Sequence, residues 1–166
     1  MPFAMRRVKQ PKWYSEAVHP WLERSDIPAD PLTDLQTRQN SLSIYLIKDD
    51  KSNLDQVVTA MSATRDSPQN FDYLLFDMEI LSQVNIEVRE SEGKTPDNEV
   101  NGWHRDLIEI SGNRLLMLVR QVLESDYETD RYLKKQIKEL VTRSMQTGQY
   151  EASRVNRSFR NKLGFS

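Results

Sequence analysis

Acidic side chains follow two apolar segments of the chain at the points where those segments end. Asp49 and Asp50 come just after the apolar run 42–47, and Asp77 follows the run 71–76. Carboxylates at the carboxyl ends of neighbouring parallel strands suit Mg²⁺, so these three residues are candidate metal ligands. Polar residues also end buried strands simply because the chain returns to water there. The sequence therefore keeps a small metal-dependent enzyme as one alternative, while no cofactor is expected.

The strings IYLIKDD and FDYLLFD resemble parts of a response-regulator receiver. In that family an acidic pair ends the first strand, and a phosphate-accepting aspartate ends the third. This chain departs from the pattern because Asp50 and Asp77 are only 27 residues apart, which leaves room for one helix and no intervening strand. The later part of the chain offers no strand-borne lysine. A working receiver is not expected.

The string HRDL at 104–107 matches the start of a kinase catalytic loop. That pattern requires an asparagine at position 111, where this chain has Ser111, and no glycine-rich phosphate loop precedes it. His104 remains a candidate acid or base beside Asp106 or Glu109, or else a cap at the start of a helix. No GxSxG elbow occurs, and two histidines without any cysteine leave little material for a zinc site. These observations favour a protein that is not an enzyme.

Both ends of the chain are basic, and the body between them is acidic. Residues 1–12 hold four basic side chains and no acid, and residues 150–166 hold four basic side chains and one acid. The overall charge of −2 therefore leaves −9 on residues 13–149. Such a distribution favours ends that contact a surface of opposite charge.

The spacing of residues 151–163 predicts a last, amphipathic helix. Its apolar residues recur every four positions and its arginines every three. The basic side would bind a partner protein or a phosphate backbone, or fold back on the acidic body of the same chain. A sequence pI of about 5.8 argues against autonomous, tight binding to nucleic acid. The candidate binding residues are Arg154, Arg157, Phe159, Arg160 and Lys162.

Apolar periodicity predicts a single α+β domain over residues 42–166. A small sheet of about three strands (residues 42–90) would pack against a C-terminal bundle of two or three helices that begins near Trp103. The direction of the strands stays open. Residues 1–41 contain five of the seven prolines together with Trp13 and Trp21, and we expect an aromatic, Pro-rich N-terminal arm packed on the outside.

The first function hypothesis is therefore a non-catalytic regulatory or assembly protein that binds a partner protein, or a second copy of itself, through its C-terminal helices and N-terminal arm. The alternative is a nucleic-acid-associated protein that uses both basic ends. No apolar run approaches the roughly 18 residues of a membrane span, and the N-terminus does not resemble a secretory signal. We expect a soluble, cytoplasmic protein without membrane contact.

Overall fold

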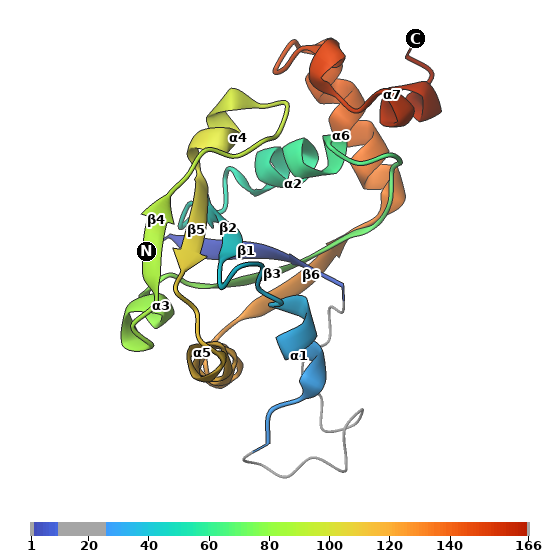
Figure 1. Ribbon diagram of the computed structural model, residues 1–166. Helices are drawn as coiled ribbons and strands as arrows, with labels where there is room; N and C mark the ends of the chain where they lie inside the picture. Colours follow the sequence, from blue (N-terminus) through green and yellow to red (C-terminus); the bar gives the residue numbers. More distant parts are fainter. Residues whose placement is uncertain (1, 10–25, 166) are drawn as a thin grey trace.

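A six-stranded antiparallel sheet forms the centre of the protein (Figure 1). The computed structural model describes residues 2–9 and 26–165. The strands lie across the sheet in the order β4-β5-β2-β1-β3-β6. Their bounds are β1 Phe3–Val8, β2 Leu42–Ile47, β3 Phe71–Asp77, β4 Glu87–Glu90, β5 His104–Ile108 and β6 Glu128–Tyr132.

Helices cover both faces of this sheet (Figure 1). On one face lie α2, α4, α6 and α7, and on the other α1, α3 and α5. A short 3₁₀ helix, η1, precedes α7. The helices are α1 Ala29–Asp34, α2 Leu54–Ala63, α3 Glu79–Gln83, α4 Asn98–Gly102, α5 Gly112–Glu124, α6 Lys134–Gln146, η1 Ala152–Arg154 and α7 Arg157–Leu163.

Alternation along the central strands divides the buried apolar side chains between two cores. On β3, Leu74 and Phe76 enter the core under α5, while Tyr73 and Leu75 enter the core under α2 and α6. Successive residues of a strand point to opposite faces, so a strand covered on both sides is apolar at nearly every position. For this reason Asp72 is the only charged residue in the segment 71–76.

β2 and β3 both pair antiparallel with β1, which lies between them. The two strands joined by α2 therefore run in the same direction without being neighbours. Phe3 stands opposite Ile47 on one side and opposite Asp77 on the other. This arrangement settles the question of strand direction that the sequence left open.

The expected architecture is wrong, although the protein is α+β. The structure has six strands and seven α-helices in its described part, with 42% helix and 24% strand, and not a three-stranded sheet against a C-terminal helical bundle. The error at the N-terminus concerns residues 3–8, which form the central strand β1 instead of an outer arm. The expected docking residues Trp13 and Trp21 lie outside the described residues.

The other two missed strands lie where the sequence analysis expected helices. Residues 104–108 form β5, and only at Gly112 does helix α5 begin, with the Ser111 side chain accepting a hydrogen bond from the Arg114 amide. Residues 128–132 form β6 at the edge of the sheet before α6. Each strand is only five residues long, so its alternation was hidden by the helical periodicity of the longer segment that follows. None of the described helices is both long and apolar enough to cross a membrane.

Candidate functional site

Polar and charged side chains occupy one end of the sheet face that carries α2. They line a pocket of about 480 Å³, here called the sheet pocket. The strands β1, β2, β3 and β5 form its floor, and its walls are the end of α2 and the loop 92–95 that follows β4. The floor residues are Arg7, Ser43, Tyr45, Phe71, His104 and Asp106.

The register of β2 and β5 explains how the polar floor arises. Tyr45 stands opposite His104, and Ser43 stands opposite Asp106. The Ser43 hydroxyl donates a hydrogen bond to the Asp106 carboxylate at 2.9 Å. Farther along the same face of β2, Ile47 is fully buried in the core. Because apolar residues fill this face wherever helices cover it, the polar pair marks the part of the sheet that the helices leave open.

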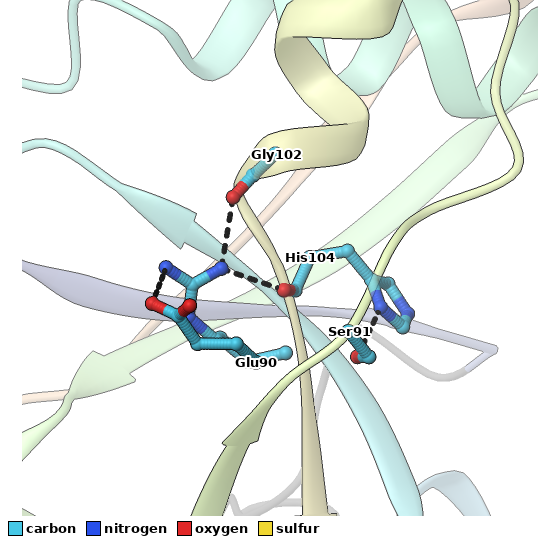
Figure 2. A network of polar contacts seen from close by, with 5 residues as sticks. Glu90, Ser91, Gly102 and His104 are labelled. Atoms are coloured by element: carbon cyan, nitrogen blue, oxygen red, sulfur yellow. Dashed lines mark hydrogen bonds and ion pairs between the residues drawn. The ribbon is translucent and has the colours of Figure 1, made fainter.

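His104 is held on two sides in the sheet pocket. Its Nδ1 lies 2.8 Å from the Ser91 hydroxyl (Figure 2). The Tyr45 ring meets the imidazole edge-on, with 5.0 Å between the ring centroids. Burial is the main cause that lowers the pKa of His104, and the nearby Asp106 carboxylate opposes it. Burial also raises the pKa of Tyr45 to about 12, so both rings are uncharged at neutral pH.

Arg105 joins β5 to the neighbouring strand β4, and Figure 2 labels its partners Glu90, Gly102 and His104. Its guanidinium lies 3.3 Å from the Glu90 carboxylate and donates to the backbone carbonyls of Gly102 and His104 at 2.8 and 2.7 Å. These contacts position the end of β5 where the His104 ring enters the pocket.

Two arginines face the sheet pocket without a recorded carboxylate partner in the described part of the chain. Arg7 is partly buried on the central strand, and its Nε is buried without a hydrogen-bond partner. Burial lowers the pKa of Arg7, repulsion from Arg65 lowers it further, and attraction from the Asp72 and Asp34 carboxylates opposes both. The nearby Asp72 is already paired with Arg131 at 2.5 Å. The pocket therefore contains two like charges whose repulsion an anion would relieve.

The two arginines are nevertheless held in place by uncharged neighbours. The Arg7 guanidinium lies 5.8 Å from the centroid of the Phe71 ring, which supports it by a cation–π contact. Arg65 donates a hydrogen bond to the Gln69 side chain at 3.2 Å. Neither contact neutralises the positive charge, so both guanidinium groups keep donors for a ligand.

Side-chain hydrogen bonds hold the loop between β4 and α4 in place. The Asn101 side chain accepts from the Thr95 amide at 2.7 Å and from the Thr95 hydroxyl at 2.8 Å, and it donates to the Thr95 carbonyl at 3.1 Å. Gly93 packs so closely that a Cβ there would lie 2.9 Å from Asn101 Oδ1 and 3.2 Å from the Tyr45 hydroxyl oxygen. This network fixes the wall of the sheet pocket.

A second depression of about 750 Å³, here called the loop pocket, adjoins the sheet pocket. The two share Thr64 and the loop 92–95 as lining. Arg154 lines the loop pocket and donates to Asn98 Oδ1 at 2.7 Å and to the Thr95 carbonyl at 3.3 Å. Lys94 lines both pockets and is exposed.

The structure separates the basic residues that the sequence placed on one C-terminal helix. Arg154 ends η1, whereas Arg157 begins α7, which also contains Arg160 and Lys162. Phe159 is 0% exposed and packs in the core under α2 and α6, so it is not accessible to a partner in this structure. A binding role for the exposed basic residues stays a prediction.

The strand-end acids take local roles at chain turns. Asp50 Oδ1 accepts a hydrogen bond from the Ser52 amide at 3.0 Å, and Asp77 Oδ1 accepts one from the Glu79 amide at 2.8 Å. β1 lies between the strands that precede them. Asp49 is exposed beside Asp50. Across residues 2–9 and 26–165, no group of three or more His, Cys, Asp or Glu side chains is arranged to hold a metal ion.

Comparisons with known proteins add no family to this description. No protein-family model matches the chain, and the searches of curated proteins and of solved structures found no match. The function must therefore be argued from the pockets themselves.

The sequence analysis singled out His104 and Asp106 but missed the arginines beside them. Arg7 was counted in the basic N-terminus, and Arg65 was not singled out. One signal was available: the segment FAMRRV has apolar residues on both sides of its two arginines and is short enough for a strand. A charged residue at an inward position of a central strand is a reason to expect a binding site.

Proposed function

We propose that this protein is a non-catalytic binding protein that holds the anionic group of a small molecule in the sheet pocket. The observation that carries the proposal is the pair of arginines, Arg7 and Arg65, which face the same pocket without a recorded carboxylate partner in the described residues. Guanidinium groups bind carboxylate and phosphate through parallel hydrogen bonds, and such charge-assisted bonds are the strong ones.

The remaining lining suits an organic ligand better than a bare ion. Phe71 and Met61 supply apolar surface next to the arginines. The neutral His104 imidazole and the Ser43–Asp106 pair supply hydrogen-bonding groups on the other side. Binding pockets commonly combine apolar walls with a few polar groups that orient the ligand.

The polar groups do not form a nucleophile–base–acid series in the contacts recorded. The Asp106 carboxylate is hydrogen-bonded to Ser43, and His104 contacts Ser91 through Nδ1. A triad needs the carboxylate on one imidazole nitrogen and the nucleophile on the other. This geometry favours binding over acyl-transfer chemistry.

Thermal unfolding in the presence of small probes tests the proposal. Phenyl phosphate and benzoate at ten times their Kd would stabilise the protein by about 1.4 kcal/mol, and would raise Tm by about 3–6 °C for a chain of this size. Benzylamine, a cation with the same ring, is the matched control and would give no shift. Inorganic phosphate tests whether the charge alone is enough.

Variants then locate the site. Arg65→Gln would abolish the shift with phenyl phosphate, whereas Arg157→Gln, at an exposed arginine that does not line either pocket, would keep it. Equal shifts in the wild type and the Arg65→Gln variant would contradict the proposal. An oligonucleotide that binds where none of the small probes does would favour the nucleic-acid alternative instead.

Assembly with a partner protein is the second candidate, and the exposure of Arg157 and Lys162 on α7 supports it. These cations would meet an acidic surface, and the contact would weaken as salt increases. A pull-down from native extract with the wild type and with an Arg157→Glu, Lys162→Glu variant tests it. A partner retained equally by both would place the interface elsewhere.

A further inference from the structure

We propose that the ligand is elongated and carries two anionic groups, one between Arg7 and Arg65 in the sheet pocket and one beside Lys94 and Arg154 in the loop pocket. This inference rests on the proposed function, because it uses the same anion site as one of its two ends. It adds the length of the ligand, its charge distribution and the residues that bind its far end.

The two pockets adjoin each other and are treated together as one depression. Both are lined by Thr64 and by the loop 92–95. Positive side chains stand at both ends, whereas Phe71 and Met61 line the first pocket alone. A ligand with a single anionic group would use only half of this space.

Arg154 is positioned before any ligand arrives. Two of its five N–H donors are recorded in hydrogen bonds, to Asn98 Oδ1 and to the Thr95 carbonyl. Thr95 is itself held by the buried Asn101 side chain. An arginine held by a rigid loop loses little conformational entropy when it binds an anion, which is the advantage of preorganisation.

Lys94 lines both pockets and adds a positive charge where they meet, within reach of the loop pocket. It comes from the same loop as Thr95, and its side chain forms no ion pair within the described part of the chain. The loop pocket is therefore lined by two cations, Arg154 and the shared Lys94.

The middle of the depression has the opposite charge. Glu92 lines both pockets, and its side chain is exposed. A carboxylate at this place repels a third anionic group in the centre of a ligand and favours hydroxyl or amine donors there. The ligand class is therefore a small molecule with phosphate or carboxylate groups at its two ends and an uncharged or donor-bearing middle.

The test uses alkane-α,ω-bisphosphates of increasing chain length and the alkyl monophosphates of the same lengths. Calorimetric titration would give, at one chain length, a bisphosphate that binds about tenfold or more tightly than its monophosphate. Arg154→Gln would remove that advantage and leave the monophosphate affinity within about twofold. Arg65→Gln would weaken both compounds. Lys94→Gln provides a second variant at the far end, and circular dichroism checks that each variant is folded.

The outcomes separate the two claims. Monophosphates that bind without a bisphosphate advantage at any length would overturn the inference and leave the anion site standing. A bisphosphate advantage that survives both Arg154→Gln and Lys94→Gln would also overturn it, because the second group would lie elsewhere. If no phosphate compound binds, the proposed function itself fails.

Discussion

Replacing Arg7 by methionine is expected to make the ligand-free protein more stable. A charge kept for a ligand costs stability when the ligand is absent, because its donors have been taken from water without a replacement. The Arg7 Nε is buried without a partner, and the guanidinium is repelled by Arg65. Methionine keeps the apolar stem on the sheet and removes the charge.

The magnitude follows from three effects of opposite sign. Removing a buried, unsatisfied donor gains about 1–3 kcal/mol. Losing the cation–π contact with Phe71 costs about 0.5–1 kcal/mol. Relief of repulsion from Arg65 adds a small further gain, reduced by solvent screening. We expect a net gain of about 1 kcal/mol in the free energy of unfolding, measured by urea titration of extensively dialysed protein, and a Tm about 2–4 °C higher.

Arg105 supplies a control with the opposite sign. Its guanidinium donates to the Gly102 and His104 carbonyls at 2.8 and 2.7 Å. Arg105→Met removes these bonds and leaves both carbonyls without that donor, which costs about 1–3 kcal/mol. If Arg7→Met instead lowered the free energy of unfolding by more than 1 kcal/mol, Arg7 would be a structural residue, and the reasoning would be refuted.

Three further predictions use other parts of the same face. Gly93→Ala would lower the free energy of unfolding by about 1–3 kcal/mol, because its Cβ would lie 3.0 Å from the Asn101 Cα. Gly102→Ala, whose Cβ would have nothing within 4 Å, would be neutral or stabilising by about 0.4–1 kcal/mol. Equal effects of the two variants in urea unfolding would contradict the packing described. Phe159→Ala would cost about 3–5 kcal/mol, because this ring fills the core; a loss below 1 kcal/mol would show that it is not buried in solution. Burial lowers the pKa of His104, so below about pH 6.5 the unfolded chain binds a proton more readily than the folded protein, and the free energy of unfolding decreases as the pH is lowered. His104→Gln would make this decrease less steep. An unchanged slope would refute the lowered pKa of His104.

The parts of the fold that the sequence predicted have strong local signals. Residues 42–47 and 71–76 are apolar at nearly every position, and the structure places them as β2 and β3, buried on both faces. Helix α2, Leu54–Ala63, connects these two strands.

The parts that the sequence missed depend on neighbours that are distant in the chain. β5 contains the charged residues Arg105 and Asp106, which are accommodated because Glu90 and Ser43 lie on adjoining strands. The sequence of residues 104–108 alone does not predict those partners. The same holds for the sheet pocket, where strand pairing and the end of α2 bring Arg7 and Arg65 together. Which charged side chains lie together in a site can be predicted only when the register of the sheet is known.

The central claim concerns an anion at Arg7, and its most direct test is the side-chain NMR signal of that residue. The Nε–Hε resonance of Arg7, assigned by comparison with the Arg7→Met variant, would be followed during titration with phenyl phosphate. We predict a progressive shift of this resonance as phosphate binds the terminal nitrogens of the same guanidinium group, with no such change for Arg157. An Arg7 resonance that stays unchanged while phenyl phosphate demonstrably binds would contradict the account.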